Sequence, residues 1–204
     1  MKEDKHILQP EGNLYNKHAS KNPVVKRIVQ GFYGAFRELA QSIVYKNVFE
    51  AGCGEAHMTG ILAEISSGAP ITASDISEKL IRKAALQYPA IKFEASSIYD
   101  LPHADGKFDL AVACEVLEHL DDPERGIKEL LRVSGKYIIV SVPNEPTWRI
   151  CNFLRGKYIM AFGNTPGHIQ HWSSGEFQIF AAKHCRVLEK RTPFPWTILL
   201  CEKR

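Results

Sequence analysis

Two stretches of the chain carry side chains whose types and spacing are suited to chemistry. The first is a glycine turn at residues 50–54 (EAGCG), followed further along the chain by Asp75. Glycines let a backbone approach a ligand closely, and the N–H groups at the start of a following helix attract negatively polarised atoms. A carboxylate at the end of the next strand can accept hydrogen bonds from both hydroxyls of a ribose. We therefore predict a nucleoside-binding site rather than a tight turn beside a surface acid.

The second stretch groups two carboxylates with an imidazole. Glu115, Glu118 and His119 follow an apolar run, and a later segment adds His168 and His171. Side chains of these types serve as general bases in proton transfer or as ligands of a divalent metal. The residues alone leave both uses open.

Strands and helices alternate along the part of the chain that carries these groups. Apolar runs predict strands at residues 46–51, 71–74, 92–95, 108–114 and 136–142. Helical stretches are predicted between them at 57–66, 77–88 and 123–133. This alternation indicates βαβ units and an α/β fold with a parallel sheet, in which ligands bind at the carboxyl ends of the strands.

Further elements are predicted at both ends of this core. Apolar residues at three- and four-residue steps predict a helix over 24–44, begun by Asn22-Pro23. A helix at 174–184 and strands at 186–191 and 196–201 are predicted to close the fold. We therefore expect a single domain, 1–204, with an N-terminal cap and helix (1–45), a binding core (46–143), an irregular insertion (144–172) and a closing part (173–204).

The ordered set of motifs resembles that of class I S-adenosylmethionine-dependent methyltransferases over about residues 46–145. The shared motifs are the glycine turn, Asp75, Leu101-Pro102 with Phe108-Asp109, and the run EVLEH at 115–119. The resemblance implies a Rossmann-like, mostly parallel seven-stranded sheet with helices on both faces. It also implies S-adenosylmethionine as cofactor and S-adenosylhomocysteine as product. A nicotinamide cofactor is disfavoured, because its G-x-G-x-x-G fingerprint needs glycine where this chain has His57.

The resemblance assigns a role to each part of the motif set. Asp75 would bind the ribose hydroxyls, Ile76 would pack on the adenine, and Ser97 with Ile98 would lie along the adenine edge. The methionine part would be bordered by Glu50, Gly52, Cys53, Gly54, Cys114 and Glu115. Two positions depart from the family pattern, since Ala56 replaces the third glycine and Ser97 stands where an acid is often found.

The expected reaction is methyl transfer to an oxygen or nitrogen atom of a small-molecule acceptor. We expect the catalytic base to be one of three histidines, oriented by one of two glutamates: His119, His168 or His171, with Glu115 or Glu118. The insertion is expected to form a substrate lid, with acceptor contacts from Trp148, Arg149, Tyr158 and Trp172. The N-terminal segment is expected to form a second cover, with Tyr15 as a further substrate contact. A competing interpretation is that these aromatic residues pack a small additional core.

Basic residues in the insertion favour an anionic acceptor. They are Arg149, Arg155 and Lys157, whose charged groups suit a carboxylate, a phosphate or a nucleotide sugar.

A divalent metal is an alternative use of the EVLEH run. In small-RNA 3′-end 2′-O-methyltransferases a similar Glu-x-x-Glu-His run, joined by a later histidine, binds a metal, and His168 or His171 would complete such a site here. The run is also common in small-molecule methyltransferases that use no metal, so we expect none. A third hypothesis is a module that binds S-adenosylmethionine without turning it over, or that uses it for other chemistry.

Composition narrows the class of partner. The 204 residues are 45% hydrophobic and 24% charged, with a net charge of +3. Acidic residues are interspersed with the basic ones, which disfavours nucleic acid, and no stretch approaches the roughly 20 apolar residues of a membrane span. Five scattered cysteines and a charged N-terminus without a following apolar run predict a cytoplasmic protein. No pattern favours one oligomeric state.

Overall fold

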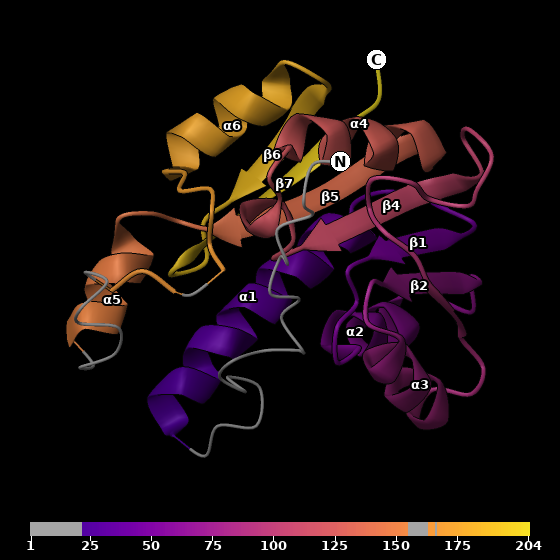
Figure 1. The fold of residues 1–204 in the computed structure, drawn as a ribbon, viewed down its shortest axis with the longest axis horizontal. Helices are drawn as coiled ribbons and strands as arrows, with labels where there is room; N and C mark the ends of the chain where they lie inside the picture. The colour runs from indigo at the N-terminus through magenta and orange to yellow at the C-terminus, as the bar shows by residue number, and fades with distance from the viewer. Residues whose placement is uncertain (1–21, 155–162, 166) are drawn as a thin grey trace, which may run out of the picture.

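The computed structural model describes residues 22–154, 163–165 and 167–204. Within these ranges the chain forms a seven-stranded sheet in the order β3-β2-β1-β4-β5-β7-β6 (Figure 1). The strands are β1 (Val48–Ala51), β2 (Ile71–Asp75), β3 (Lys92–Ala95), β4 (Phe108–Cys114), β5 (Ser134–Pro143), β6 (Arg186–Arg191) and β7 (Trp196–Glu202). Strand β7 is antiparallel to both of its neighbours, and the other pairings are parallel. The predicted α/β fold with a mostly parallel seven-stranded sheet is confirmed.

Helices cover both faces of the sheet, as the sequence predicts. They are α1 (Pro23–Gln41), α2 (His57–Ile65), α3 (Glu78–Gln87), α4 (Pro123–Val133) and α6 (Ser174–Ala182). One apolar cluster joins α1 and α2 to the sheet through residues such as Phe36 and Leu62. The other joins α4 and α6 to the opposite face through residues such as Leu130 and Phe177. Figure 1 shows α4 and α6 on one side of the strands and α1 and α2 on the other.

The strand order creates a crevice at the carboxyl ends of β1 and β4. Strands β2 and β3 lie on one side of β1, whereas β4 and β5 lie on its other side. The connections that leave β1 and β4 therefore run to opposite faces of the sheet, which separates their loops and leaves a binding position between them. The glycine turn follows β1, Asp75 ends β2, and Glu115 follows β4.

The insertion is less irregular than predicted. Its first part forms helix α5 (Thr147–Leu154), which extends beyond the carboxyl end of β5 in Figure 1. The prediction of an irregular segment is wrong here, because Pro146 precedes the eight helical residues and does not interrupt them. The N–H of Ile150 donates to the carbonyl of Pro146 at 3.0 Å, so the proline lies immediately before the first residue of the helix.

No helix within the described ranges is long and apolar enough to cross a membrane.

Candidate active site

The glycine turn between β1 and α2 requires backbone conformations that side chains resist. Gly52 and Gly54 have φ values of +70° and +52°. A Cβ atom on Gly52 would lie 2.5 Å from Cγ2 of Val116, in the loop after β4. Glycine is therefore required where the two loops approach each other. Ala56, at the third motif position, also has a positive φ of +60°, which explains the preference of the family pattern for glycine there.

Asp75 links the glycine turn to the start of α3. Its Oδ2 accepts a hydrogen bond from the N–H of Gly54, and its Oδ1 accepts one from the N–H of Ser77, both at 2.9 Å. These two bonds use half of the roughly four acceptor sites of a carboxylate. The next side chain, Ile76, is 53% exposed although it is apolar. An anchored carboxylate beside an open apolar side chain matches the requirements of a ribose with its attached base.

Glu50 is a buried acid beneath the glycine turn. Its side chain is 2% exposed and accepts a hydrogen bond of 2.5 Å from the hydroxyl of Thr59 in α2. The pKa of Glu50 is raised from 4.5 to about 7, chiefly by burial; the Thr59 hydrogen bond opposes the shift, and the negative charge of Asp75 adds to it. Sequence reasoning missed Thr59, because a threonine inside a short helix gives no sign of its partner.

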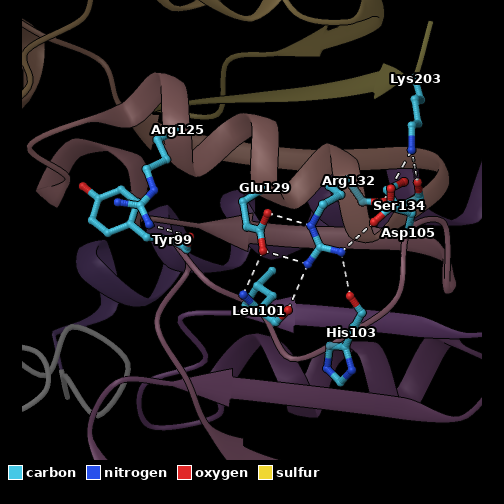
Figure 2. A network of polar contacts seen from close by, with 9 residues as sticks. All are labelled: Tyr99, Leu101, His103, Asp105, Arg125, Glu129, Arg132, Ser134 and Lys203. Atoms are coloured by element: carbon cyan, nitrogen blue, oxygen red, sulfur yellow. Dashed lines mark hydrogen bonds and ion pairs between the residues drawn. The ribbon is translucent and has the colours of Figure 1, made fainter.

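The segment between β3 and β4 is held by one arginine from α4, as Figure 2 shows. The guanidinium of Arg132 donates to the carbonyl oxygens of Leu101 at 2.9 Å and His103 at 2.6 Å. It also pairs with Glu129 and Asp105, each at 2.7 Å. We call this group the Arg132 clamp. The sequence around Arg132 does not predict this group, since a basic residue on a surface helix is usually solvated.

Ser97 and Ile98 open the segment that the Arg132 clamp holds. The hydroxyl of Ser97 accepts a hydrogen bond from the N–H of Tyr99 at 3.2 Å. Ile98 is 9% exposed and packs within the core cluster beneath α4. Contact between Ile98 and an adenine edge would therefore use its backbone rather than its side chain.

The residue after β4 has an unusual backbone and a firmly bound side chain. Glu115 has a φ of +61°, a conformation that residues with a side chain rarely adopt. Its Oε2 accepts a hydrogen bond from the indole N–H of Trp196 at 2.7 Å, and its Oε1 accepts one from the hydroxyl of Ser141 at 3.3 Å. The preceding Cys114 is buried, which raises the pKa of its thiol well above the usual value. Sequence reasoning missed Trp196, which it assigned only to a closing strand.

Glu118, His119 and His168 come together at this edge of the sheet. One ligand atom from each lies within 4.8 Å of the other two, and Glu118 is 1% exposed. The Nδ1 of His119 lies 2.8 Å from the carbonyl oxygen of Gly167. A carbonyl only accepts, so Nδ1 carries the proton and Nε2 carries the lone pair. His119 Nε2 lies 4.0 Å from Glu118 Oε1.

The third candidate histidine, His171, contacts a different residue. His171 is exposed, and its Nε2 is 2.8 Å from Oδ1 of Asn164. Of the two glutamates expected to orient a base, Glu118 is the one near His119, and Glu115 bonds to Trp196 and Ser141.

The expected acceptor residues fall into three groups. Trp148 donates its indole N–H to Thr165 at 2.9 Å, with its ring centroid 5.6 Å from that of Trp196. Arg149 lies on the same helix, α5. Trp172 packs against Phe177 and Phe180 of α6, with ring centroids 5.6 and 5.2 Å away, which supports the interpretation of a small additional core for this residue. Tyr15 and Tyr158 lie outside the described residues, as do Arg155 and Lys157.

Comparisons with known proteins agree with this arrangement. A family model described as a methyltransferase domain matches residues 49–139, which hold the glycine turn, Asp75 and the EVLEH run. The ubiquinone biosynthesis O-methyltransferase of Coxiella burnetii is 33% identical over 104 residues, covering 48% of this chain and 44% of that protein. The chain spans less than half the length of the curated relatives it matches.

Two solved structures share the fold. The magnesium protoporphyrin IX methyltransferase of Synechocystis, with bound S-adenosylhomocysteine, has a TM-score of 0.65 at 19% identity, covering 91% of this chain and 90% of that one. The methyltransferase domain of a bacterial Hen1 protein has a TM-score of 0.63 at 22% identity, covering 86% and 98%. At these identities the likeness shows the fold and not the acceptor.

Proposed function

Because the chain belongs to the family of class I S-adenosylmethionine-dependent methyltransferases, we propose that it transfers the methyl group of this cofactor to an oxygen or nitrogen atom of a small-molecule acceptor. The observation that carries the proposal is the joined unit of the glycine turn and Asp75 at the strand-order reversal. This unit lies at the crevice where open α/β sheets bind their ligands.

The residues of the crevice fit the proposed cofactor. Asp75 would hold the ribose hydroxyls, and the open side chain of Ile76 would cover one face of the adenine. The adenine edge would lie along Ser97 and Ile98. The methionine part would lie along the glycine turn, bordered by Glu50, Gly52, Cys53, Gly54, Cys114 and Glu115. Bound there, the cofactor supplies an activated methyl group on a positively charged sulfur.

The acceptor must lie where β4 and the insertion meet. Methyl transfer depends mainly on alignment, which can contribute several kcal/mol, and an acceptor hydroxyl additionally needs a base. We assign that role to His119, because its Nδ1 proton is committed to Gly167 and its Nε2 is left as the basic atom. Glu118 is the nearby acid that would stabilise the protonated ring.

A small-molecule acceptor is supported by the Coxiella relative, whose name places it in ubiquinone biosynthesis. We propose that α5 and residues 163–165 and 167–172 form the lid over this acceptor. Arg149 is the described basic residue that favours an anionic group in it.

A metal-assisted reaction is the second candidate, favoured by the grouping of Glu118, His119 and His168. One carboxylate and two imidazoles suit a first-row divalent metal. A metal-binding histidine usually donates its other ring N–H to a carbonyl or carboxylate, as His119 does to Gly167. In this case His119 and His168 would hold the metal and would not act as bases. The acceptor could then be an RNA 2′-hydroxyl, as the sequence motif suggests.

Formation of S-adenosylhomocysteine from S-adenosylmethionine tests both candidates. We would screen phenols, carboxylates, amines and a short RNA, each with and without EDTA. The first candidate predicts turnover with a small molecule that EDTA leaves unchanged and that His119→Ala lowers at least about 100-fold. Turnover that EDTA abolishes and added Mn²⁺ restores would support the metal-assisted candidate instead. Binding of the cofactor without turnover of any acceptor would contradict both and support a binding module.

A further inference from the structure

The contacts of Glu115 suggest a device that the motif set does not explain. Both carboxylate oxygens are hydrogen-bonded to side chains from other strands, Oε2 to Trp196 and Oε1 to Ser141. The backbone of Glu115 has a φ of +61°. A residue with a side chain persists in that conformation only where its surroundings hold it, and such positions cluster at functional sites.

The sheet topology explains why a residue so distant in sequence reaches this carboxylate. Strand β5 pairs with β4 on one side, where Ser141 lies opposite Cys114. On its other side β5 pairs with antiparallel β7, where Pro143 lies opposite Trp196. The first residue of β7 therefore lies at the same edge of the sheet as the last residue of β4. Trp196 would lie at the far edge if β7 were parallel to β5.

The indole of Trp196 is held in one orientation. Its side chain is 3% exposed, and its ring centroid lies 5.0 Å from that of Phe32 in α1 and 5.6 Å from that of Trp148 in α5. A ring packed between two helices cannot turn its N–H away from Glu115 without repacking both. The hydrogen bond therefore fixes the carboxylate and is not merely an incidental contact.

The loop that carries Glu115 meets the glycine turn. Val116, the residue next to Glu115, contacts the glycine turn so closely that a Cβ on Gly52 would lie 2.5 Å from it. The methionine part of the cofactor is proposed to lie along that turn. A negative charge held next to it would attract a cation at the transfer position.

We propose that Trp196 is a positioning residue, which holds the Glu115 carboxylate at the methyl-transfer position and so lets it stabilise positive charge there. This inference rests on the proposed function. A pre-oriented charge stabilises a charged species better than a mobile one, because no reorganisation is needed when the species arrives. Trp196 acts through Glu115 and is not itself expected to touch the acceptor.

Two cofactor analogues test this without knowledge of the acceptor. S-adenosylhomocysteine has no group at the transfer position, whereas sinefungin carries an amine there that is cationic at neutral pH. Calorimetry would give the affinity ratio of sinefungin to S-adenosylhomocysteine for the wild type, E115Q, W196F and S141A. We expect E115Q to lower the ratio roughly tenfold and W196F by at least about threefold, with the S-adenosylhomocysteine affinity of W196F within about twofold of the wild type. S141A, which removes the longer bond, should have a smaller effect in the same direction.

The hydrogen bond itself has a spectroscopic signature that packing alone would not produce. The three tryptophans of the chain give three indole N–H signals in a ¹H–¹⁵N spectrum. One signal should be lost in W196F, and the same signal should shift in E115Q. If W196F does not fold, the shift in E115Q and the ratios for E115Q and S141A decide the question.

The outcomes distinguish a failure of the proposed function from a failure of the role of Trp196. A wild type that binds neither analogue contradicts the proposed function. A wild type that binds both, with a ratio that E115Q lowers and W196F leaves unchanged, overturns the role of Trp196 alone. A ratio that E115Q leaves unchanged overturns the placement of the carboxylate, and with it the whole inference.

Discussion

The unliganded protein should become less stable as the pH rises, and replacing Glu50 with glutamine should make this loss of stability smaller. The Glu50 carboxyl is buried beneath the glycine turn, and burial raises its pKa from 4.5 to about 7. The folded-state pKa thus lies above the unfolded one. The stability that this group contributes is fully present below about pH 4.5 and is lost as the pH rises through about 7.

The magnitude follows from the difference between the two pKa values. A shift from 4.5 to about 7 disfavours the ionised carboxyl in the folded state by about 3 kcal/mol. Most of this destabilisation develops between about pH 5 and about pH 8. The free energy of unfolding of the wild type should therefore fall by roughly 2–3 kcal/mol over this range from Glu50 alone. In a domain of this size that corresponds to a fall in melting temperature of about 5–10 °C. Glu50→Gln removes the ionisation and keeps a side chain that can still bond to Thr59.

Thermal unfolding of the wild type and Glu50→Gln from about pH 5 to about pH 8 provides the assay. The difference between the two melting curves isolates Glu50, because the other titrating groups are common to both proteins. Glu64→Gln, which replaces a 63% exposed carboxylate on α2, is the matched control and should leave the slope unchanged. Parallel slopes for the wild type and Glu50→Gln would refute the reasoning.

Three further substitutions have defined outcomes. Gly52→Ala should cost about 2 kcal/mol more than Gly54→Ala, because both positions have positive φ but only the first places a Cβ against Val116; equal melting temperatures would contradict this. The free energy of unfolding of Glu115→Gly should be about 1 kcal/mol higher than that of Glu115→Ala, because glycine adopts a φ of +61° without strain. Denaturant titration measures this difference, and a more stable alanine variant would contradict the prediction. Arg132→Lys should cost about 1–3 kcal/mol, since lysine cannot bridge two loop carbonyls and two carboxylates; an unchanged melting curve would show that the Arg132 clamp is not structural.

Local patterns allowed the fold and the core of the site to be predicted. The spacing of apolar residues in a strand or an amphipathic helix shows which side of the element is buried. These elements lie near their predicted bounds. The glycine turn is visible because glycine is required by its own backbone angle, and Asp75 because it ends a strand. Such features can be recognised in the sequence without knowledge of how the elements pack.

Contacts between distant elements could not be predicted. Trp196 reaches Glu115 only because β7 enters the sheet antiparallel beside β5. Arg132 and Thr59 likewise lie in sequences that predict a helix but give no sign of the residues they contact. The histidines show the same limit, since the motif left His168 and His171 equivalent and the path of the insertion brought only His168 to Glu118.

Helix α5 was missed for a different reason. A proline near a segment predicts an interruption, whereas Pro146 lies immediately before the helix. The meaning of a proline depends on whether it falls inside or outside the helical turns, and composition alone does not distinguish the two cases.

Calorimetric titration with S-adenosylhomocysteine tests the central claim most directly, run beside NADH on the wild type and Asp75→Ala. The account predicts one S-adenosylhomocysteine bound per chain, an affinity at least about tenfold weaker in Asp75→Ala because two ribose hydrogen bonds are lost, and no binding of NADH. Binding of NADH without S-adenosylhomocysteine would contradict the cofactor assignment. S-adenosylhomocysteine affinity that is unchanged in Asp75→Ala would contradict the site.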